Sequence, residues 1–180
     1  MNQKSSKADE LFFVVDEHDQ PLAPLPRKLV HGHGVWHRAS HVALVNGRGE
    51  ILCHQRALNK EIDPGMWVAV FGGHLAPNEP YESAARRELQ EETGVVADNL
   101  KLWRVHKFVD PTGYNNEFQA VFIGHWDGQA TQVRLDDGEV AQVKWFPFAA
   151  VQKAFAANDP QWFAGTHQPQ LLEALIDGAV

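Results

Sequence analysis

Apolar residues divide the chain into short strands and a few helices. Two β-rich runs, 38–45 and 51–56, flank an Asn46-Gly47 turn. An Asn-Gly pair between such runs is a strong local signal of a β-hairpin. Further strands are predicted at 11–16, 67–71, 100–109, 116–126 and 142–146. The chain is therefore expected to contain a sheet of several strands.

Helical periodicity is clearest between Pro80 and Gly94. Pro80 suits the first helical turn, because its missing N–H would be unpaired there in any residue. Gly94 suits the position just past the helix end, where a left-handed backbone costs glycine least. Ala84, Ala85 and Leu89 supply the apolar stripe between them. Two more helices are predicted, at 148–157 and 169–176.

The remaining stretches are predicted to lack regular structure. Residues 1–9 are polar and are expected to form a disordered tail. The stretch 28–36 is rich in glycine and histidine and is predicted to be irregular, and 133–140 is predicted to be a loop. Residues 10–180 would then form a single domain. Strands on both sides of a central helix, followed by two more helices, predict a mixed sheet between helices, an α/β (α+β) class.

Composition narrows the expected partners and location. The net charge is −7, from 23 acidic and 16 basic residues, which argues against a broad nucleic-acid-binding surface. The single cysteine, Cys53, excludes an internal disulfide and fits a reducing compartment. The first ten residues lack the apolar stretch of a secretory signal. No run approaches the roughly 18 apolar residues of a membrane span, so we expect a cytoplasmic protein that does not enter a membrane.

A cluster of carboxylates marks the predicted helix. Glu88, Glu91 and Glu92 lie three and four residues apart and share one helix face. Like charges at this spacing oppose helix formation by roughly 0.2–0.5 kcal/mol per pair. A hard divalent cation such as Mg²⁺, which takes oxygen ligands and commonly holds substrate phosphates, would reverse that penalty. The alternative is a solvated acidic helix end.

The whole stretch GHLAPNEPYESAARRELQEETGV, from Gly73 to Val95, resembles the signature of the Nudix hydrolases. That signature is a glycine, five residues, a glutamate, seven residues and then REUxEExGU, where U is aliphatic. Every specified position matches. The resemblance implies an α/β/α sandwich with a mixed β-sheet. It also implies cleavage of a diphosphate bond, dependent on Mg²⁺ or Mn²⁺, in a small molecule such as a nucleoside diphosphate derivative or a related organic diphosphate.

The resemblance also assigns roles within the signature. The implied metal ligands are Glu88, Glu91 and Glu92. Gly73 would bring its backbone close to the metal. Glu79 and Arg87 would form a structural pair that holds the loop onto the helix.

Two further roles fall partly outside the signature. The general base would be a signature glutamate, Glu91 or Glu92, or a glutamate on a distant loop, for which Glu139 is the candidate. Arg56 and Lys60 lie near the predicted mouth of the site and are expected to meet a phosphate. The alternative for Arg56 and Lys60 is ordinary surface charge, and for Glu139 an exposed turn.

A second constellation resembles one branch of this family. The segments 36–39, 55–60 and 63–67 are similar to the branch that includes isopentenyl diphosphate isomerase and its hydrolase relatives. The isomerases hold a metal with histidines and with glutamates on a late strand. The matching positions are His37, His74 and Glu117, with either His31 or His33 as the earlier histidine, and Asn115 in place of a second glutamate. The alternative is a set of histidines satisfied by backbone hydrogen bonds.

The same resemblance argues against isomerase chemistry. The isomerases need a cysteine immediately before the Gly-His pair, where this chain has Gly72, and Cys53 lies on a different strand. Protonating an unactivated alkene requires a strong, positioned acid. A hydrolase is therefore favoured, with an isomerase or a non-catalytic Nudix-fold binding module as alternatives. The sequence does not report the oligomeric state, but Nudix proteins are often dimers, so a homodimer is compatible with the resemblance.

Overall fold

The computed structural model describes residues 9–59, 63–97, 99–135, 138, 140–163 and 168–178. A two-stranded sheet of β1 (Leu11–Phe12) and β2 (Leu25–Pro26) leads into helix α1 (Arg27–Gly32). The main sheet contains β3 (His37–Val45), β4 (Glu50–Arg56), β5 (Trp67–Val68), β6 (Phe71–His74), β7 (Leu100–Val109), β8 (Asn116–His125) and β9 (Val140–Pro147). The other helices are α2 (Tyr81–Thr93), the 3₁₀ turn η2 (Ala130–Gln132), α3 (Phe148–Ala156) and α4 (Gln168–Ile176).

The main sheet is mixed, as predicted. Its order is β5-β4-β3-β8-β7, and β6 pairs with β3 while β9 pairs with β4. Strands β3 and β8 run parallel, whereas the other pairs are antiparallel. The predicted hairpin of β3 and β4 forms around Asn46-Gly47. Strands β3 and β8, which carry the predicted site residues His37 and Glu117, therefore lie next to each other inside this sheet.

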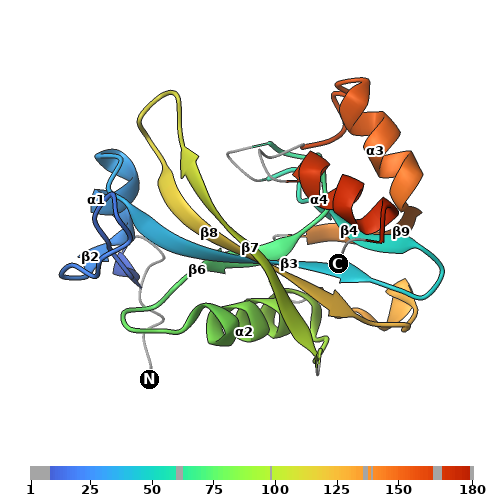
Figure 1. Ribbon diagram of the computed structural model, residues 1–180, viewed down its shortest axis with the longest axis horizontal. Coiled ribbons are helices and arrows are strands. Elements are labelled where there is room, and N and C mark those ends of the chain that lie inside the picture. Colours follow the sequence, from blue (N-terminus) through green and yellow to red (C-terminus); the bar gives the residue numbers. More distant parts are fainter. Residues whose placement is uncertain are drawn as a thin grey trace.

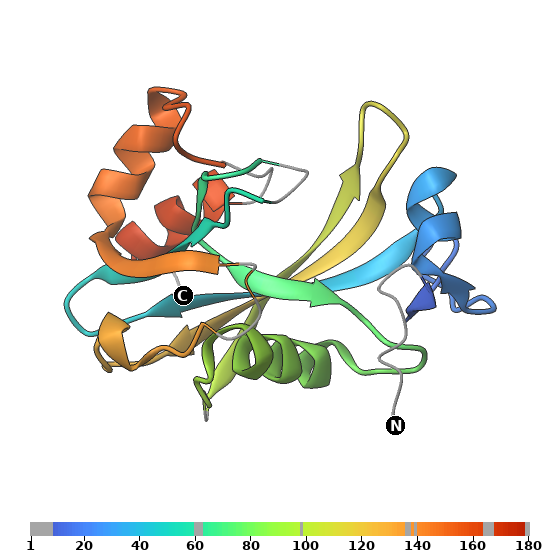
Figure 2. The same cartoon turned by 180° about the vertical axis from the view of Figure 1, so that it is seen from behind.

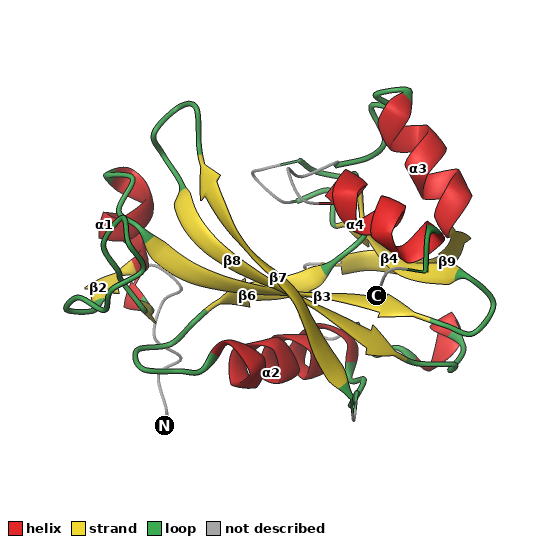
Figure 3. Ribbon diagram, viewed as in Figure 1, coloured by secondary structure: helices red, strands yellow, loops and turns green. Residues whose placement is uncertain are grey.

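Helices cover both faces of this sheet (Figures 1 and 2). Helix α2 lies on one face, and α3 and α4 lie on the other. Successive side chains of β3 point to opposite faces of the sheet. Val42 and Leu44 pack with the α2 residue Leu89, while Ala43 packs with the α4 residue Leu171. The predicted α/β/α sandwich is confirmed, and colouring by secondary structure displays the three layers (Figure 3).

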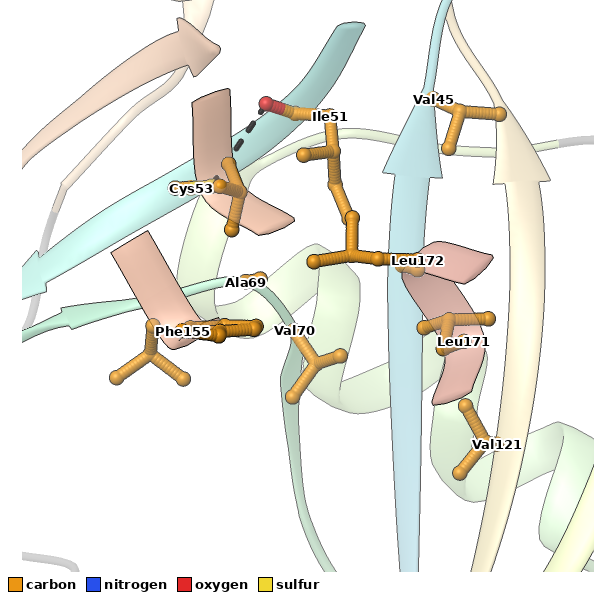
Figure 4. Close-up of a cluster of buried hydrophobic side chains, with 12 residues drawn as sticks. Val45, Ile51, Cys53, Ala69, Val70, Val121, Phe155, Leu171 and Leu172 are labelled. Carbon is orange, nitrogen blue, oxygen red and sulfur yellow. Dashed lines mark hydrogen bonds between the residues drawn. The ribbon is translucent and has the colours of Figure 1, made fainter. Parts of the chain in front are cut away.

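The core on the α3 and α4 side is drawn in Figure 4. Phe155 of α3 and Leu172 of α4 gather with Cys53 of β4 and Val121 of β8. Complete burial of a leucine or phenylalanine side chain contributes roughly 1.5–3 kcal/mol. Cys53 is fully buried, and this burial raises the pKa of its thiol. The thiol is therefore part of the packing and not a nucleophile.

Three predicted elements differ in the structure. The stretch 28–36 is not wholly irregular, because α1 begins after Pro26 and is anchored by the fully buried Val30. The predicted strand 11–16 continues beyond β1 only as single bridges at Val14 and Val15. The predicted strand 67–71 is divided into β5 and β6, which pair with different neighbours. The predicted tail lies outside the described residues except for Asp9.

Candidate active site and metal ligands

Helix α2 presents the signature residues. The helix begins after Pro80 and ends at Gly94, whose φ of 68° is left-handed and whose N–H donates to the Gln90 carbonyl. Both ends confirm the predicted boundaries. Ala85 and Leu89 are buried against the sheet, so the opposite face of the helix is free to carry charge.

Glu79 and Arg87 are brought together in two parallel hydrogen bonds. Arg87 Nε donates to Glu79 Oε1 and Nη2 donates to Oε2, each at 2.9 Å. Arg87 Nη2 also reaches the His74 carbonyl oxygen at 3.2 Å, and Glu79 Oε2 accepts from the Ala76 N–H at 2.9 Å. Burial alone would raise the pKa of Glu79, but the Arg87 and Ala76 hydrogen bonds lower it. This arrangement fastens the loop after β6 to α2.

The three signature glutamates occupy different environments. Glu88 is mostly buried, and burial raises the pKa of its carboxyl group despite Arg87 Nη1 at 2.6 Å. Glu91 is 61% exposed and lies 3.3 Å from the same nitrogen. Glu92 Oε2 accepts a hydrogen bond from the Gly72 N–H at 3.0 Å. Clustered carboxylates held in this way are the oxygen ligands that Mg²⁺ and Mn²⁺ accept.

Two glycines bring strand β6 against these glutamates. A Cβ atom on Gly73 would lie 2.6–2.7 Å from the Glu88 carboxyl atoms. A Cβ atom on Gly72 would lie only 2.0 Å from the Ser40 carbonyl oxygen, and Gly72 has a φ of 153°, which L side chains rarely adopt. The backbone at Gly72 therefore has no room for the cysteine that the isomerases carry here.

A second cluster forms where three strands and α1 meet. Its members are His31, His37, His74 and Glu117, and one ligand atom from each lies within 4.8 Å of all the others. Strand register explains the grouping: Glu117 of β8 is the Cα partner of His37 on β3, and His74 of β6 is the partner of Ala39. Helix α1 supplies His31. The exposed His33 instead contacts the Leu29 carbonyl, so His31 is the earlier histidine of this group.

The hydrogen bonds of this cluster leave lone pairs directed inward. His37 Nδ1 lies 2.8 Å from the Val35 carbonyl, which makes Nδ1 the protonated nitrogen. His37 Nε2 then faces Glu117 Oε1 at 3.3 Å, and His37 Nε2 and His31 Nε2 are buried without a hydrogen-bond partner among the described residues. Acceptors that face one another repel unless a cation lies between them. The donor set therefore fits a metal ion that accepts imidazole and carboxylate.

Electrostatics keep these groups in the ligating form. Burial lowers the pKa of His31 to about 4 and also lowers the pKa of His74, so both imidazoles stay neutral near pH 7. Burial would raise the pKa of the Glu117 carboxyl group, but the hydrogen bond with His74 Nε2, at 3.2 Å from Glu117 Oε1, lowers it. Glu117 also accepts from Asn115 Nδ2 at 3.0 Å. Neutral imidazoles around one carboxylate are ready to bind a cation without first losing a proton.

One cavity of about 290 Å³ is lined by one carboxylate from each of the two groups. Glu92 and Gly72 of the signature region line it together with Glu117 of the second cluster. Arg56 also lines this cavity. Lys60 and Glu139, the other predicted substrate and base residues, lie outside the described residues.

Several lining residues carried no sequence signal. Phe163 and Gln168 come from the C-terminal segment. Gln168 Oε1 accepts from the Ala69 N–H at 3.3 Å, and the Phe163 N–H donates to the Trp67 carbonyl at 2.9 Å. His54 lies on β4 and is 6% exposed. The sequence indicated a strand here, but it could not show that a cavity would open beside His54.

The chain is similar to known proteins over most of its length. The model of the NUDIX domain matches residues 35–165. An uncharacterised Nudix hydrolase of Pseudomonas aeruginosa is 33% identical over 155 residues, which cover 86% of this chain and 89% of the relative. An isopentenyl-diphosphate Delta-isomerase of Paenarthrobacter aurescens is 33% identical over 175 residues, 93% of each chain.

Solved structures share the fold. A protein of Deinococcus radiodurans has a TM-score of 0.71 at 21% identity, covering 92% of this chain and 99% of its own. A MutT protein of Methanosarcina mazei has a TM-score of 0.63 at 20% identity, covering 80% of this chain and 95% of its own. Within the described residues, no helix is both long and apolar enough to cross a membrane.

Proposed function

The chain belongs to the Nudix hydrolase family, and we propose that it cleaves a diphosphate bond in a nucleoside diphosphate derivative or a related organic diphosphate. The observation that carries the proposal is the position of Glu92. This glutamate belongs to an intact signature on α2 and lines the cavity beside Gly72. A carboxylate in that position can hold a cation against a bound diphosphate.

Glu88, Glu91, Glu92 and the Gly73 backbone would hold Mg²⁺ or Mn²⁺. When bound, the ion supplies charge neutralisation for the diphosphate and lowers the pKa of a water molecule. Arg87 lies 2.6 Å from Glu88 and 3.3 Å from Glu91, and so limits repulsion within the acidic group. The Glu79 pair holds Arg87 in that position.

The remaining roles in the proposal concern the substrate and the proton. Arg56, which lines the cavity, would bind a phosphate oxygen, and Lys60 would have the same role. Glu91, Glu92 or Glu139 would accept the proton of the attacking water. These assignments follow the family resemblance, and the cavity position of Arg56 and Glu92 supports them.

The cluster of His31, His37, His74 and Glu117 would hold a second metal ion. Its imidazole-rich donor set favours a transition metal such as Mn²⁺ or Zn²⁺ over Mg²⁺, which prefers oxygen ligands. Because Glu117 lines the same cavity as Glu92, this ion would lie beside the substrate. Elemental analysis of protein prepared without added metal, compared with a His37→Gln variant, tests the second site.

The test of the proposed function is phosphate release from a panel of nucleoside diphosphate derivatives and isopentenyl diphosphate, with Mg²⁺ or Mn²⁺. We expect release from the wild type and its loss in Glu92→Gln. Glu82→Gln is the matched control, since Glu82 lies on the same helix but pairs with Arg86 at the surface. Equal release by the wild type and Glu92→Gln would contradict the proposal.

Two alternatives remain distinguishable in the same experiment. The names of several relatives and the histidine cluster favour an isomerase, whereas the crowded backbone at Gly72 opposes it. Conversion of isopentenyl diphosphate without phosphate release would support the isomerase. Binding of a nucleotide without turnover, in both the wild type and Glu92→Gln, would support a binding module.

The proposal also includes an oligomeric state, a homodimer, and a location, the cytoplasm. A homodimer is expected from the family, and light scattering on the purified protein tests it. A cytoplasmic location is supported by the reduced, buried Cys53. Fractionation of cells that produce the protein tests the location.

A further inference from the structure

A phenylalanine ring packs against the histidines of the second cluster. Phe12 of β1 is fully buried, and its ring is stacked on His74 with centroids 4.1 Å apart and an interplanar angle of 17°. The ring is also stacked on His37 and meets His31 edge-on, each with centroids 5.4 Å apart. Phe12 thus contacts every imidazole of the candidate metal cluster.

The chain segment that carries Phe12 precedes the matched NUDIX domain, which begins at residue 35. It is nevertheless built into the sheet. The Phe13 N–H donates to the Leu75 carbonyl at 2.9 Å, and the Arg38 N–H donates to the Phe13 carbonyl at 3.1 Å. Phe12 is therefore held between the start of β3 and the end of β6, the strands that carry His37 and His74.

We infer that Phe12 is a positioning residue that seals the histidine cluster and makes its metal ion slow to exchange, an inference that rests on the second metal site of the proposed function. A metal ion leaves a protein when water or a chelator replaces its ligands one by one. An apolar ring packed on the imidazole faces excludes water there and restricts rotation of the ligands. Partners outside the ligand set that orient ligands typically change metal affinity about 10–100-fold.

The stacking itself becomes more favourable when an ion is bound. Coordination withdraws electrons from an imidazole, and an aromatic face attracts the resulting positive charge. Low polarity around the cluster further strengthens the attraction between the ion and Glu117. The signature site differs, because Glu91 is 61% exposed and its ion would exchange readily with solvent. The two sites would therefore bind one slow and one fast metal ion.

The experiment loads the full chain with Co²⁺, whose visible absorption reports its nitrogen and oxygen ligands, and follows loss of that absorption after a chelator is added. Phe12→Leu keeps most of the buried volume but removes the ring. We expect it to retain the wild-type spectrum and to lose the ion about 10-fold faster. Val14→Ala is the control for packing, because Val14 shares the same buried group as Phe12 but is not a ring partner of the histidines.

Each outcome has one meaning. Equal rates for Phe12→Leu and wild type, or equal acceleration in Phe12→Leu and Val14→Ala, would overturn the role of Phe12. A wild type whose Co²⁺ absorption and release match those of His37→Gln would overturn the second metal site, and the inference with it. The experiment does not measure phosphate release, so its result does not depend on whether the protein is a hydrolase.

Discussion

The backbone of Gly73 lies against the carboxyl group of Glu88, so close that a Cβ atom would meet the carboxyl carbon at 2.6 Å. The obstacle is the far end of a flexible side chain and not the backbone. Gly73 also lacks a positive φ. An alanine at this position is therefore compatible with folding but would displace a candidate metal ligand.

Gly73→Ala is thus expected to reduce kcat/KM about 100-fold, since a displacement of about 1 Å at a reacting centre has that effect. The midpoint of thermal unfolding should change by only a few degrees, which corresponds to about 1 kcal/mol or less. Phosphate release and thermal unfolding of the same preparations check both halves. Wild-type activity in Gly73→Ala would show that the close approach to Glu88 is not needed.

A substitution at the neighbouring Gly72 should mainly reduce stability, in contrast to Gly73→Ala, which should mainly reduce activity. Its Cβ would collide with the Ser40 carbonyl oxygen at 2.0 Å, and its φ of 153° suits glycine. Gly72→Cys should lower the free energy of unfolding by about 1–3 kcal/mol without producing isomerase activity. Denaturant unfolding and an isopentenyl diphosphate assay test this pair of outcomes. A stable variant that isomerises its substrate would mean that the position tolerates the isomerase thiol.

Much of this site could be predicted because α2 carries local signals. Pro80 and Gly94 mark its ends, and the spacing of the glutamates places them on one face. The mixed sandwich likewise follows from the order of the strands and helices. These features depend on residues close in sequence, which is why the sequence indicates them.

The second cluster depends on contacts between distant segments. His31 and His33 are equivalent in sequence, but the placement of α1 brings only the His31 ring close to those of His37 and His74, with centroids 5.2 and 5.0 Å apart. The turn after α1 is fastened to the first residue of β8, because Asn116 Nδ2 donates to the Gly34 carbonyl at 2.9 Å. Phe12 carried no signal of its own, because a phenylalanine in a short apolar run is ordinarily a core residue.

A substitution of Arg87 tests whether the loop after β6 is held to α2 by the two parallel hydrogen bonds to Glu79 or by charge alone. Arg87→Lys keeps the charge but cannot make two parallel bonds to Glu79. Because Arg87 is 33% exposed, solvent screening limits the effect, and we expect the free energy of unfolding to fall by about 1 kcal/mol. Arg48→Lys, at an exposed pair with Glu50, is the matched control and should change it by less than about 0.5 kcal/mol. Equal effects would refute a special role for the Glu79 pair.

His54 gives the structure a pH dependence. Burial, with a smaller contribution from Arg56, lowers the pKa of His54 from 6.5 to about 3. Between these values the unfolded chain binds a proton that the folded chain excludes, so stability falls as the pH falls below 6.5. The expected loss is about 1.4 kcal/mol per pH unit, or about 2 kcal/mol at pH 5.

The measurement for His54 is the free energy of unfolding at pH 7.5 and pH 5, compared between wild type and His54→Leu. The variant should lose this part of the pH dependence whatever its stability at neutral pH. His18→Gln, in an exposed turn, controls for the loss of any histidine. A pH dependence in His54→Leu as steep as that of the wild type would exclude His54 as its source.

A substitution of Arg56 tests whether this side chain binds the substrate in the cavity. Arg56 lines the cavity that also contains Glu92, so a phosphate bound there would meet both a guanidinium and the signature. Arg56→Gln should raise KM about 10-fold and change kcat less, since a charge-assisted hydrogen bond contributes roughly 1.5–3 kcal/mol and part of it is recovered by glutamine. Arg48→Gln removes an arginine from the exposed turn between β3 and β4 and should leave KM unchanged. Parallel changes in both variants would indicate a general loss of positive charge, whereas a fall in kcat alone for Arg56→Gln would place Arg56 at the transition state and not in substrate binding.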